Sequence, residues 1–328
     1  MLLSTTGPDG TTRYVDQLVA HPDGVEHLFF GWRRALFGRY DVFHVHWPEA
    51  LVRSRSRTLR LLRRAATAAL LARLRLTRTA VVRTVHNSRP HRAGDSGEER
   101  LVDALDALVD TYVCLNELTV TRPGPERVVI PLGSYHEPFA DMPRSDDRAG
   151  LLFFGRIDAY KGVDDLILAF SELVDPTLTL RVVGQPHGDV TTMVRTAAAD
   201  PRISLALAFV PDRDLVLDVT AAELAVLPYR HLENSAVVLV ALSLGTPVLA
   251  RRSPTIELLQ EEVGSRWIRL FEGTLDAAVL KDALAWAQED RPGGPPPMPG
   301  RDWSSIGAAH ASVYRALIER RTAGKTVG

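Results

Sequence analysis

The sequence predicts an α/β protein built from two doubly wound domains in tandem, and three observations lead to this expectation. At 328 residues the chain is longer than one ordinary hydrophobic core supports, so two domains are expected. Short apolar runs alternate with helix-like segments along the whole chain, which is typical of parallel sheets covered by helices on both faces. Near the middle, residues 131–150 interrupt the alternation with prolines, glycines and charges, and indicate an interdomain linker.

Each half of the chain supplies its own series of strands. In the first half the apolar runs predict strands at 2–6, 27–30, 41–47, 80–86, 111–116 and 127–131. In the second half they predict strands at 151–156, 178–184, 203–209, 224–229, 246–251 and 267–271. Helices are expected at 59–76, 163–174, 235–245 and 303–321, and the proline-rich stretch 290–301 is an irregular connection. We therefore expect domains at 1–140 and 150–295, with ligands in the cleft between them.

Composition argues against several classes of function. A formal net charge of -1 lacks the basic excess of a dedicated nucleic-acid binder, so no nucleic-acid partner is expected. The single cysteine, Cys114, excludes an internal disulfide and is typical of a reducing compartment. The first residues lack a signal-peptide pattern, and no segment has the uninterrupted apolar length of a membrane span. A cytoplasmic protein is expected. The missing G-x-G-x-x-G and P-loop motifs argue against a nicotinamide-dependent oxidoreductase and a P-loop hydrolase.

One region is strongly basic. Ten arginines and no acidic residue fall between Leu51 and Arg83, and residues 59–76 have helical spacing with leucines and alanines on one side. Two interpretations stay open. The helix contacts an anionic membrane surface, or it packs on a sheet and turns a solvated basic face outward.

The stretch FFGRIDAYKG, residues 153–162, places two cations in one short loop after a strand. The strand ends at Gly155, so Arg156 stands at its carboxyl end, and Lys161 precedes Gly162, where a helix begins. The forked donors of arginine and the compact charge of lysine suit a diphosphate. The competing interpretation is a strand-end arginine and a surface lysine that hold no ligand.

A second phosphate-binding element is expected where an apolar helix follows strand 224–229. Asn234 and Ser235 are favourable N-cap residues, and Gly245 ends the helix. Free backbone N–H groups at such a helix start form a cradle for phosphate. The signal is weak alone, because every helix has an N-cap. Combined with the two loop cations it predicts one diphosphate site.

The first half carries histidines at the ends of two strands. His44 and His46 lie on the same side of one strand, and His86 with Asn87 ends another. A zinc site needs three or four convergent ligands, and no cysteine or carboxylate has matching spacing, so no metal is expected. His44 is interpreted as a hydrogen-bonded core residue and His86 as a residue facing the cleft. The D-x-D pattern at 212–214 opens a helix, where acids favour the helix dipole, and is interpreted as capping.

Taken together, these motifs resemble the GT-B glycosyltransferases of the large family-4-type bacterial group. The shared stretches occur in the right order over nearly the whole chain: DVFHVHW, RTVHN, FFGRIDAYKGVDDLILAF, LRVVGQP and LPYRHLENSAVVLVALSLGTPVL. The resemblance implies two Rossmann-like domains, the first binding the acceptor and the second the nucleotide-diphosphate sugar. It implies that the last helix, 303–323, crosses back to the first domain, and that no metal or other cofactor takes part.

The resemblance also assigns roles to individual residues. Arg156 and Lys161 hold the donor pyrophosphate, and His86 touches the donor sugar. The first loop and the neighbouring strand ends contact the acceptor or the donor sugar, which names Gly7, Asp9, Gly10, His46 and Asn87.

The chain departs from the family in the loop-to-helix element. Two glutamates eight residues apart are common there, but the second position is Val240, and the first falls at Leu232 beside Glu233. The start of the helix resembles a divergent subgroup with Asn-Ser-Gly, in which Ala236 replaces the glycine. This departure leaves the donor and the stereochemical outcome open. The element's donor-binding candidates are Glu233, Asn234 and Ser235.

Inverting sugar transfer needs a group that deprotonates the acceptor hydroxyl. The candidates are Asp9, Asp16, Glu49 and His86. Glu49 and His86 rank first, because Asp16 is expected on a helix surface and Asp9 in a turn.

The resemblance therefore implies a metal-independent hexosyltransferase with a hydroxyl acceptor, and the appearance of the subgroup suggests GDP-mannose, or else a UDP-sugar, as its donor. The acceptor is lipid-linked or a small glycan or natural product. The alternative, left open by Val240 and Ala236, is a non-catalytic protein that binds a sugar nucleotide in a degenerate donor site.

Overall fold

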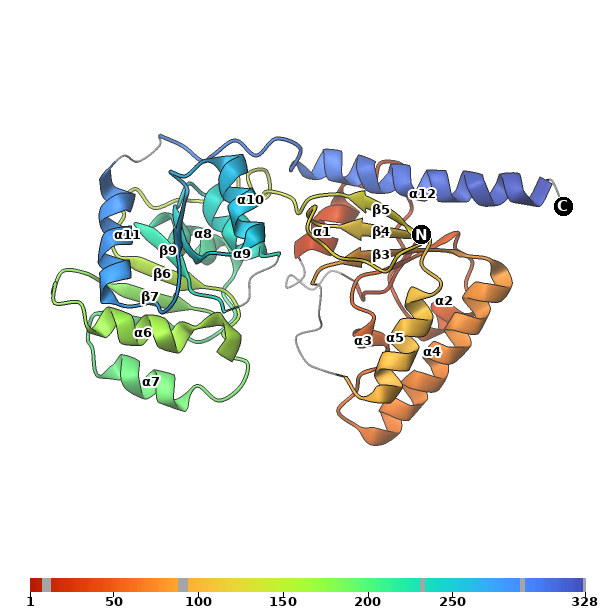
Figure 1. Cartoon of the computed structure of the whole chain (residues 1–328), viewed down its shortest axis with the longest axis horizontal. Coiled ribbons are helices and arrows are strands. Elements are labelled where there is room, and N and C mark those ends of the chain that lie inside the picture. The colour runs from red at the N-terminus through yellow and green to blue at the C-terminus, as the bar shows by residue number, and fades with distance from the viewer. Residues whose placement is uncertain (8–12, 88–93, 231–233, 290–292, 327–328) are drawn as a thin grey trace. The chain divides into compact units, whose positions relative to one another are not determined.

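The computed structural model describes residues 1–7, 13–87, 94–230, 234–289 and 293–326. The chain forms two compact units, one of Met1–Gly133 with Gly300–Gly328 and the other of Ser134–Pro299. Each unit contains a parallel β-sheet with helices packed against it (Figure 1). The expected fold class, two parallel-sheet α/β domains, is confirmed.

The first unit holds a sheet whose five parallel strands follow one another in chain order: β1 (Leu2–Leu3), β2 (Val42–Val45), β3 (Ala80–Val85), β4 (Thr111–Cys114) and β5 (Glu126–Val129). Its helices are α1 (Arg13–Ala20), α2 (Trp32–Phe37), α3 (Glu49–Val52), α4 (Arg57–Thr77), α5 (Ser96–Asp106) and α12 (Trp303–Thr326). Every residue of β2 and β4 is buried, which explains why both strands are unbroken apolar or weakly polar runs in the sequence.

The second unit holds six parallel strands in the order β11-β10-β9-β6-β7-β8. Their bounds are β6 (Leu151–Phe154), β7 (Leu180–Val183), β8 (Ile203–Ala206), β9 (Leu224–Leu227), β10 (Val248–Arg251) and β11 (Ile268–Phe271). The chain winds outward in one direction from β6 and in the other from β9. The strand order thus reverses between β6 and β9, and doubly wound folds bind ligands beside the carboxyl ends of the strands at such a point.

The helices of the second unit cover both faces of this sheet. They are the short 3-10 helix η1 (Ala159–Lys161), α6 (Val163–Ser171), α7 (Thr191–Ala198), α8 (Asp212–Thr220), α9 (Ala236–Ser243), α10 (Pro254–Val263) and α11 (Ala277–Glu289). Helix α9 is apolar up to its last residue, Ser243, and six of its eight residues are buried, so it lies in the core of the unit except at its first turn.

The strand predicted at 27–30 is wrong. This segment runs beside β1 and exchanges backbone hydrogen bonds with it, from Leu3 N to the Leu28 carbonyl and from Phe30 N to the Thr5 carbonyl, each 2.8 Å. Only Leu2 and Leu28 form a bridge. Because β1 itself is two residues long, the ladder is too short to make a further strand.

Helix α12 packs within the first unit. Trp303 at its start is fully buried, and the Tyr314 hydroxyl shares a 2.7 Å hydrogen bond with His44 of β2. Near the other end, Arg321 pairs with Asp110 at 2.6 Å. The last helix therefore returns to the sheet made by the first third of the chain.

The stretch 131–150 contains no helix or strand, as its composition predicts. It is nevertheless packed in its middle. Tyr135 and Phe139 are buried with their rings stacked at 5.5 Å, and the Tyr135 N–H donates to Ser243 Oγ at 2.8 Å. Most of the expected linker thus belongs to the packed structure of the second unit.

The basic helix α4 departs from a simple amphipathic pattern. Thr67, Leu70, Leu71 and Leu74 face the core. The outward face also carries leucines, since Leu61, Leu62 and Leu76 are 66%, 62% and 85% exposed. Within the described parts of the chain, no helix combines the length and the apolar character needed to cross a membrane.

Candidate functional site

The loop after β6 carries a buried lysine. Gly155 and Gly162 flank the loop with φ of 107° and 67°, in the left-handed region that glycine tolerates. The Lys161 side chain lies between them, and the residue is only 6% exposed. Its Nζ donates to the Tyr229 hydroxyl at 3.2 Å and lies 4.7 Å from the centre of that ring. The alternative interpretation of Lys161 as a surface lysine is therefore wrong.

The surroundings of Lys161 disfavour its charge. Burial, followed by the nearby Arg156 guanidinium, lowers the pKa of Lys161 to about 8, against the opposing effect of Asp158. Its direct partners, a hydroxyl and an aromatic face, are both neutral. A group of anionic charge placed beside the ammonium would reverse this effect and favour the protonated form.

Arg156 stands at the edge of the same loop. Its Nε donates to Asp158 Oδ2 at 2.6 Å, and the other oxygen of Asp158 lies 3.5 Å from His187 Nδ1. About half of the Arg156 side chain remains accessible. Asp158 thus fixes the orientation of a guanidinium that can still meet a ligand from outside.

Helix α9 begins next to this loop. Ser235 is its N-cap residue by position, but no side-chain hydrogen bond caps the first turn. Burial raises the pKa of Tyr229, and a side-chain hydrogen bond with Ser235 acts in the opposite direction. Tyr229 therefore contacts Ser235 as well as Lys161, and lies between Lys161 and the start of the helix. A Cβ at Gly155 would lie 3.2 Å from Val237 of α9 and 3.5 Å from Lys161 Nζ. The end of β6, the ammonium and the first turn of α9 therefore meet at one place.

This place lies at the switch point of the second sheet. A helix N-terminus presents N–H groups and a partial positive charge, and a lysine and an arginine add two cations. The combination suits a phosphate or diphosphate group. Of the residues that the sequence suggests for this role, Arg156, Lys161 and Ser235 are at this edge, and Asn234 immediately precedes Ser235. Glu233 lies outside the described residues.

Sequence reasoning missed Tyr229, which joins Lys161 to the start of α9. It directly follows Pro228 at the end of β9, within the stretch LPYRHLENS. Its position after a strand beside the switch point is the feature of the sequence that could have identified it. Val240 is buried inside α9, so the position at which the family often has a glutamate contributes no carboxylate. The helix ends at Ser243 with Leu244 as its C-cap, and the φ of 74° at Gly245 matches the expected glycine stop.

The first unit gathers histidines around Tyr14. His44 is fully buried, with Nδ1 2.7 Å from the Tyr314 hydroxyl and Nε2 2.8 Å from Thr84 Oγ1. The interpretation of His44 as a hydrogen-bonded core histidine is confirmed. His310 of α12 lies 2.9 Å from the Tyr14 hydroxyl through Nε2. These contacts attach α1, β2 and α12 to one another.

His46 and His86 form a pair. His46 Nδ1 lies 3.1 Å from His86 Nε2, and the ring of Trp47 stacks on His86 at 4.4 Å. Burial lowers the pKa of His86 to about 3, with Arg83 and His310 adding to the effect, and burial lowers the pKa of His46 well below its usual value. Both imidazoles are therefore neutral near pH 7. Asn87 directly follows His86 at the end of β3.

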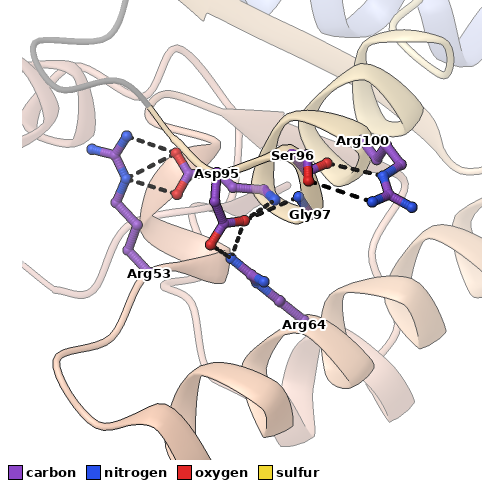
Figure 2. A network of polar contacts seen from close by, with 7 residues as sticks. Arg53, Arg64, Asp95, Ser96, Gly97 and Arg100 are labelled. Atoms are coloured by element: carbon purple, nitrogen blue, oxygen red, sulfur yellow. Dashed lines mark hydrogen bonds and ion pairs between the residues drawn. The ribbon is translucent and has the colours of Figure 1, made fainter.

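Glu49 is the first residue of α3, and its charge acts on Arg53. The pKa of Arg53 is raised chiefly by its hydrogen bond to Glu98, with Glu49 contributing. Figure 2 shows Arg53 beside Asp95 and Arg64, where α3, α4 and the start of α5 come together. Arg53 is bidentate on Glu98, and Arg64 Nη2 lies 2.7 Å from each Asp95 oxygen. These pairs fix the start of α5 against the segment after α3 and against α4.

Gly7 and Asp16 line a cavity of about 440 Å³ inside the first unit. Asp16, expected to be an acid on a helix surface, lies in the first turn of α1 and is partly exposed, with its Oδ1 atom buried. Asp9 and Gly10 of the same loop lie outside the described residues.

No three His, Cys, Asp or Glu side chains of the described ranges are grouped so as to hold a metal ion. The D-x-D residues Asp212 and Asp214 fall in the first turn of α8, as their interpretation as helix-opening acids requires.

Comparison with known proteins adds a sequence relationship to this geometry. Residues 148–289 match the family described as "Glycosyl transferases group 1". The chain is 42% identical to GDP-mannose:glycolipid 4-beta-D-mannosyltransferase of Xanthomonas campestris pv. campestris, over 97% of this chain and 92% of the relative. It is 30% identical to D-inositol 3-phosphate glycosyltransferase of Acidothermus cellulolyticus, over 69% of this chain and 57% of that relative.

A solved structure with the same fold is HepE of Anabaena in complex with UDP-glucose. It superimposes with a TM-score of 0.62 at 14% sequence identity, and the match covers 98% of each chain. At this identity the likeness concerns the fold alone.

Proposed function

The chain belongs to the glycosyl transferases group 1 family, and we propose that it moves a mannosyl group from GDP-mannose to a glycolipid hydroxyl. It is a GT-B glycosyltransferase that takes a hexosyl group from a nucleotide sugar, as its motifs suggested. The choice of mannose, of the guanine nucleotide and of a glycolipid acceptor is supported by the relative that is 42% identical over 97% of the chain.

The observation that carries the proposal is the buried Lys161 beside the uncapped start of α9. Burying an ammonium is costly, and a lysine in an ordinary structural role would point its charge into water. At the switch point of a doubly wound sheet, the ammonium and the helix N–H groups serve to bind the donor diphosphate, with Arg156 on the accessible side. The second unit is thus the donor-binding domain.

The same groups would assist the chemical step. The bond between the anomeric carbon and the diphosphate oxygen breaks, and its electron pair passes to the leaving nucleotide diphosphate. Lys161, Arg156 and the first turn of α9 stabilise the charge that grows on that leaving group. They need no reorganisation at that moment, because Tyr229 and Asp158 already hold the two cations in place.

The stereochemistry adds a requirement on the first unit. GDP-mannose is an α-glycosyl phosphate, and a β-mannoside, as in the name of the Xanthomonas relative, arises from it only when configuration inverts. Inversion in one step needs a base that takes the proton of the acceptor hydroxyl. His86 is one candidate, with an imidazole that is neutral near pH 7 but that burial makes a weak base, and Glu49 is a second candidate. His46 is hydrogen-bonded to His86 and Asn87 follows it in the chain, and these two residues with Gly7 are the candidates that place the acceptor or the donor sugar.

The outward face of α4 supports attachment to a membrane. Leu61, Leu62 and Leu76 of α4 and Phe37 of α2 are exposed. Residues 51–83 hold ten arginines and no acidic residue, although Arg53 and Arg64 pair with Glu98 and Asp95. Exposed leucines can enter the interface of a bilayer while arginines meet anionic headgroups. We infer a peripheral contact with the cytoplasmic face of a membrane, where a glycolipid acceptor would be reached.

Incubation with GDP-mannose, UDP-glucose, UDP-galactose and ADP-glucose, each with alkyl glycoside acceptors, tests the proposal. GDP-mannose should be turned over faster than the others by about tenfold or more. Turnover of a UDP-sugar alone would contradict the guanine nucleotide. Binding of a sugar nucleotide with no transfer or hydrolysis in any pairing would favour the degenerate, non-catalytic alternative.

A further inference from the structure

A chain of buried polar side chains joins the last helix of the protein to the sheet of the first unit. It starts on α12, where His310 Nδ1 lies 2.8 Å from the carbonyl oxygen of Ile306, one turn earlier. A carbonyl oxygen only accepts, so Nδ1 carries the proton. Burial lowers the pKa of His310 to about 4, so the ring is neutral near pH 7 and its Nε2 can only accept. The Tyr14 hydroxyl, 2.9 Å from that nitrogen, therefore donates to it.

The direction of the other bonds in the chain follows from this one. Burial raises the pKa of Tyr14, and a side-chain hydrogen bond with Thr84 acts in the opposite direction. Since the Tyr14 proton is used on His310, Thr84 supplies the proton of this bond. Burial keeps His44 neutral by lowering its pKa well below the usual value. Thr84 Oγ1 then accepts from His44 Nε2 at 2.8 Å, and His44 Nδ1 accepts from the Tyr314 hydroxyl at 2.7 Å. The bonds thus all point one way, from Tyr314 to His310.

This chain lies against the pair formed by His46 and His86. Thr84 precedes His86 by two residues at the end of β3, so both side chains lie on the same side of the sheet. His44 precedes His46 in the same way at the end of β2, and their rings are 4.3 Å apart. The centre of the Tyr14 ring lies 5.1 Å from that of His86, with the two rings at 90°, and 5.6 Å from that of His46. Tyr14 is therefore both a member of the chain and a direct neighbour of a candidate base.

We propose that His310 is a positioning residue for the sugar transfer. By accepting the hydrogen bond from Tyr14, it holds in place the aromatic ring that His86 meets at a right angle. The inference rests on the proposed function and adds α12 to the parts of the protein that determine its rate. His86 serves the step either as the base or as a contact of the donor sugar, and both tasks need a ring held within about 0.5 Å.

The other neighbours of His86 come from the sheet. His46 and Trp47 follow β2, and they contact His86 through a 3.1 Å hydrogen bond and a ring stacked at 4.4 Å. Tyr14 belongs to α1, and the hydroxyl of Tyr14 is held by α12. The position of the His86 ring therefore depends on the last helix of the chain through Tyr14.

The polar character of the chain is better explained by positioning than by packing. Tyr14, His44 and His310 are all buried, and burying polar groups costs desolvation that apolar side chains of similar size would avoid. What the hydrogen bonds add is a defined position. The Tyr14 hydroxyl donates to His310 and accepts from Thr84, so the ring is restrained along its long axis. A phenylalanine there would fill the same space without this restraint.

Breaking the chain at its two ends separates the two roles. His310→Leu and Tyr14→Phe remove the bond that holds Tyr14, whereas Tyr314→Phe removes the bond that holds His44. Each change deletes one buried hydrogen bond of α12, so all three should lower the Tm to a similar extent. Only the first two should lower kcat, by about tenfold, with KM for GDP-mannose within about twofold of the wild type. His310→Gln, whose side-chain carbonyl can accept from Tyr14, should keep kcat within about threefold.

A double variant separates positioning from stability. Each single change leaves one member of the Tyr14–His310 pair buried without its partner, and Tyr14→Phe/His310→Leu removes both polar groups. Its Tm should therefore return part of the way to the wild-type value. Its kcat should remain about tenfold low, because the ring at position 14 still lacks its restraint.

NMR of protein with isotope-labelled histidine follows His86 without any substrate. The His86 ring signals, identified by their loss in His86→Gln, should move in His310→Leu and Tyr14→Phe and stay in place in Tyr314→Phe. Tyr14→Phe carries the comparison should His310→Leu fail to fold. Unmoved His86 signals, or an equal loss of kcat in Tyr314→Phe, would overturn the inference. A wild type that neither binds GDP nor transfers mannose would instead overturn the proposed function, and the NMR comparison would still decide the role of His310.

Discussion

The Lys161 ammonium donates to the Tyr229 hydroxyl at 3.2 Å and lies 4.7 Å from the centre of its ring. Lys161 comes from the loop after β6 and Tyr229 from the end of β9, so the contact spans the switch point of the second sheet. The direct partners of this buried cation are neutral, and the site is therefore suited to receive an anion.

Lys161 is expected to lower the stability of the protein when no ligand is bound. Its pKa in the folded protein is about 8, below the ordinary lysine value of 10.5. Between these two pKa values the unfolded chain binds more protons than the folded protein. The free energy of unfolding therefore rises with pH across that range. Lys161→Met should therefore raise the free energy of unfolding at pH 7 by roughly 1–3 kcal/mol. Urea unfolding at pH 7 and pH 10 measures this. The control is Lys281→Met on the exposed side of α11, which should change little.

Donor affinity should fall as pH rises through about 8. Below that pH the free protein has a charged Lys161, and above it the diphosphate must first restore the proton. The dissociation constant for GDP should then increase by up to about tenfold per pH unit. Lys161→Arg stays charged throughout and should show no such inflection. A flat GDP affinity between pH 6 and pH 9 in the wild type would show that the ammonium does not meet the diphosphate.

Tyr229→Phe should weaken donor turnover without unfolding the protein. The ring and its packing on Lys161 remain, but the hydroxyl that links the ammonium to the Ser235 side of α9 is lost. We expect kcat/KM for the donor to fall about three- to tenfold, the cost of losing one hydrogen bond worth about 1 kcal/mol. The comparison is Tyr160→Phe, a neighbouring ring from η1. An unchanged kcat/KM in Tyr229→Phe would show that Tyr229 contributes only packing.

His86 should not cause an acid limb near neutral pH. Burial lowers its pKa to about 3, so the imidazole stays neutral and able to accept a proton down to that range. The plot of kcat/KM against pH should be level from pH 5 to pH 7, and His86→Gln should lower it by about 100-fold at every pH if His86 is the base. An inflection near pH 6.5 that disappears in His86→Gln would contradict the neutral imidazole. A level profile with no loss would transfer the role to Glu49.

The outward leucines of α4 should control binding to anionic vesicles. The double variant Leu61→Ser/Leu62→Ser should reduce co-sedimentation with phosphatidylglycerol vesicles severalfold, because each serine removes exposed apolar surface from the contact. The matched control is Leu168→Ser/Val174→Ser in the second unit, where both residues are also exposed. Binding should weaken with added salt as the arginines are screened. Equal loss in both double variants would argue against α4 as the membrane face.

Much of the fold could be predicted from the sequence because parallel strands are buried on both faces. The runs around Val82, Val113, Phe153 and Val226 are apolar for that reason, and the helices between them follow from their spacing. The segment 27–30 has the same composition but lacks a partner long enough to form a ladder. Strand formation there depended on the length of β1, which is not a local property.

The candidate site was predictable where local sequence fixes the geometry. Gly155 and Gly162 limit the Lys161 loop, and the apolar run of α9 locates its start. The positions of Tyr229 and Asp16 could not be predicted in the same way. A tyrosine after a strand gives no sign of where its hydroxyl points, and the helical spacing of Asp16 gives no sign that its Oδ1 atom is buried.

The central claim is that Lys161 and the start of α9 bind the diphosphate of a guanine nucleotide, and isothermal titration with GDP at pH 7 tests it most directly. The account predicts tight binding of GDP to the wild type, weaker binding of UDP, and a loss of about 1–3 kcal/mol of GDP binding free energy in Lys161→Met but not in Lys281→Met. Equal GDP affinity in the wild type and Lys161→Met, with both proteins folded, would contradict it.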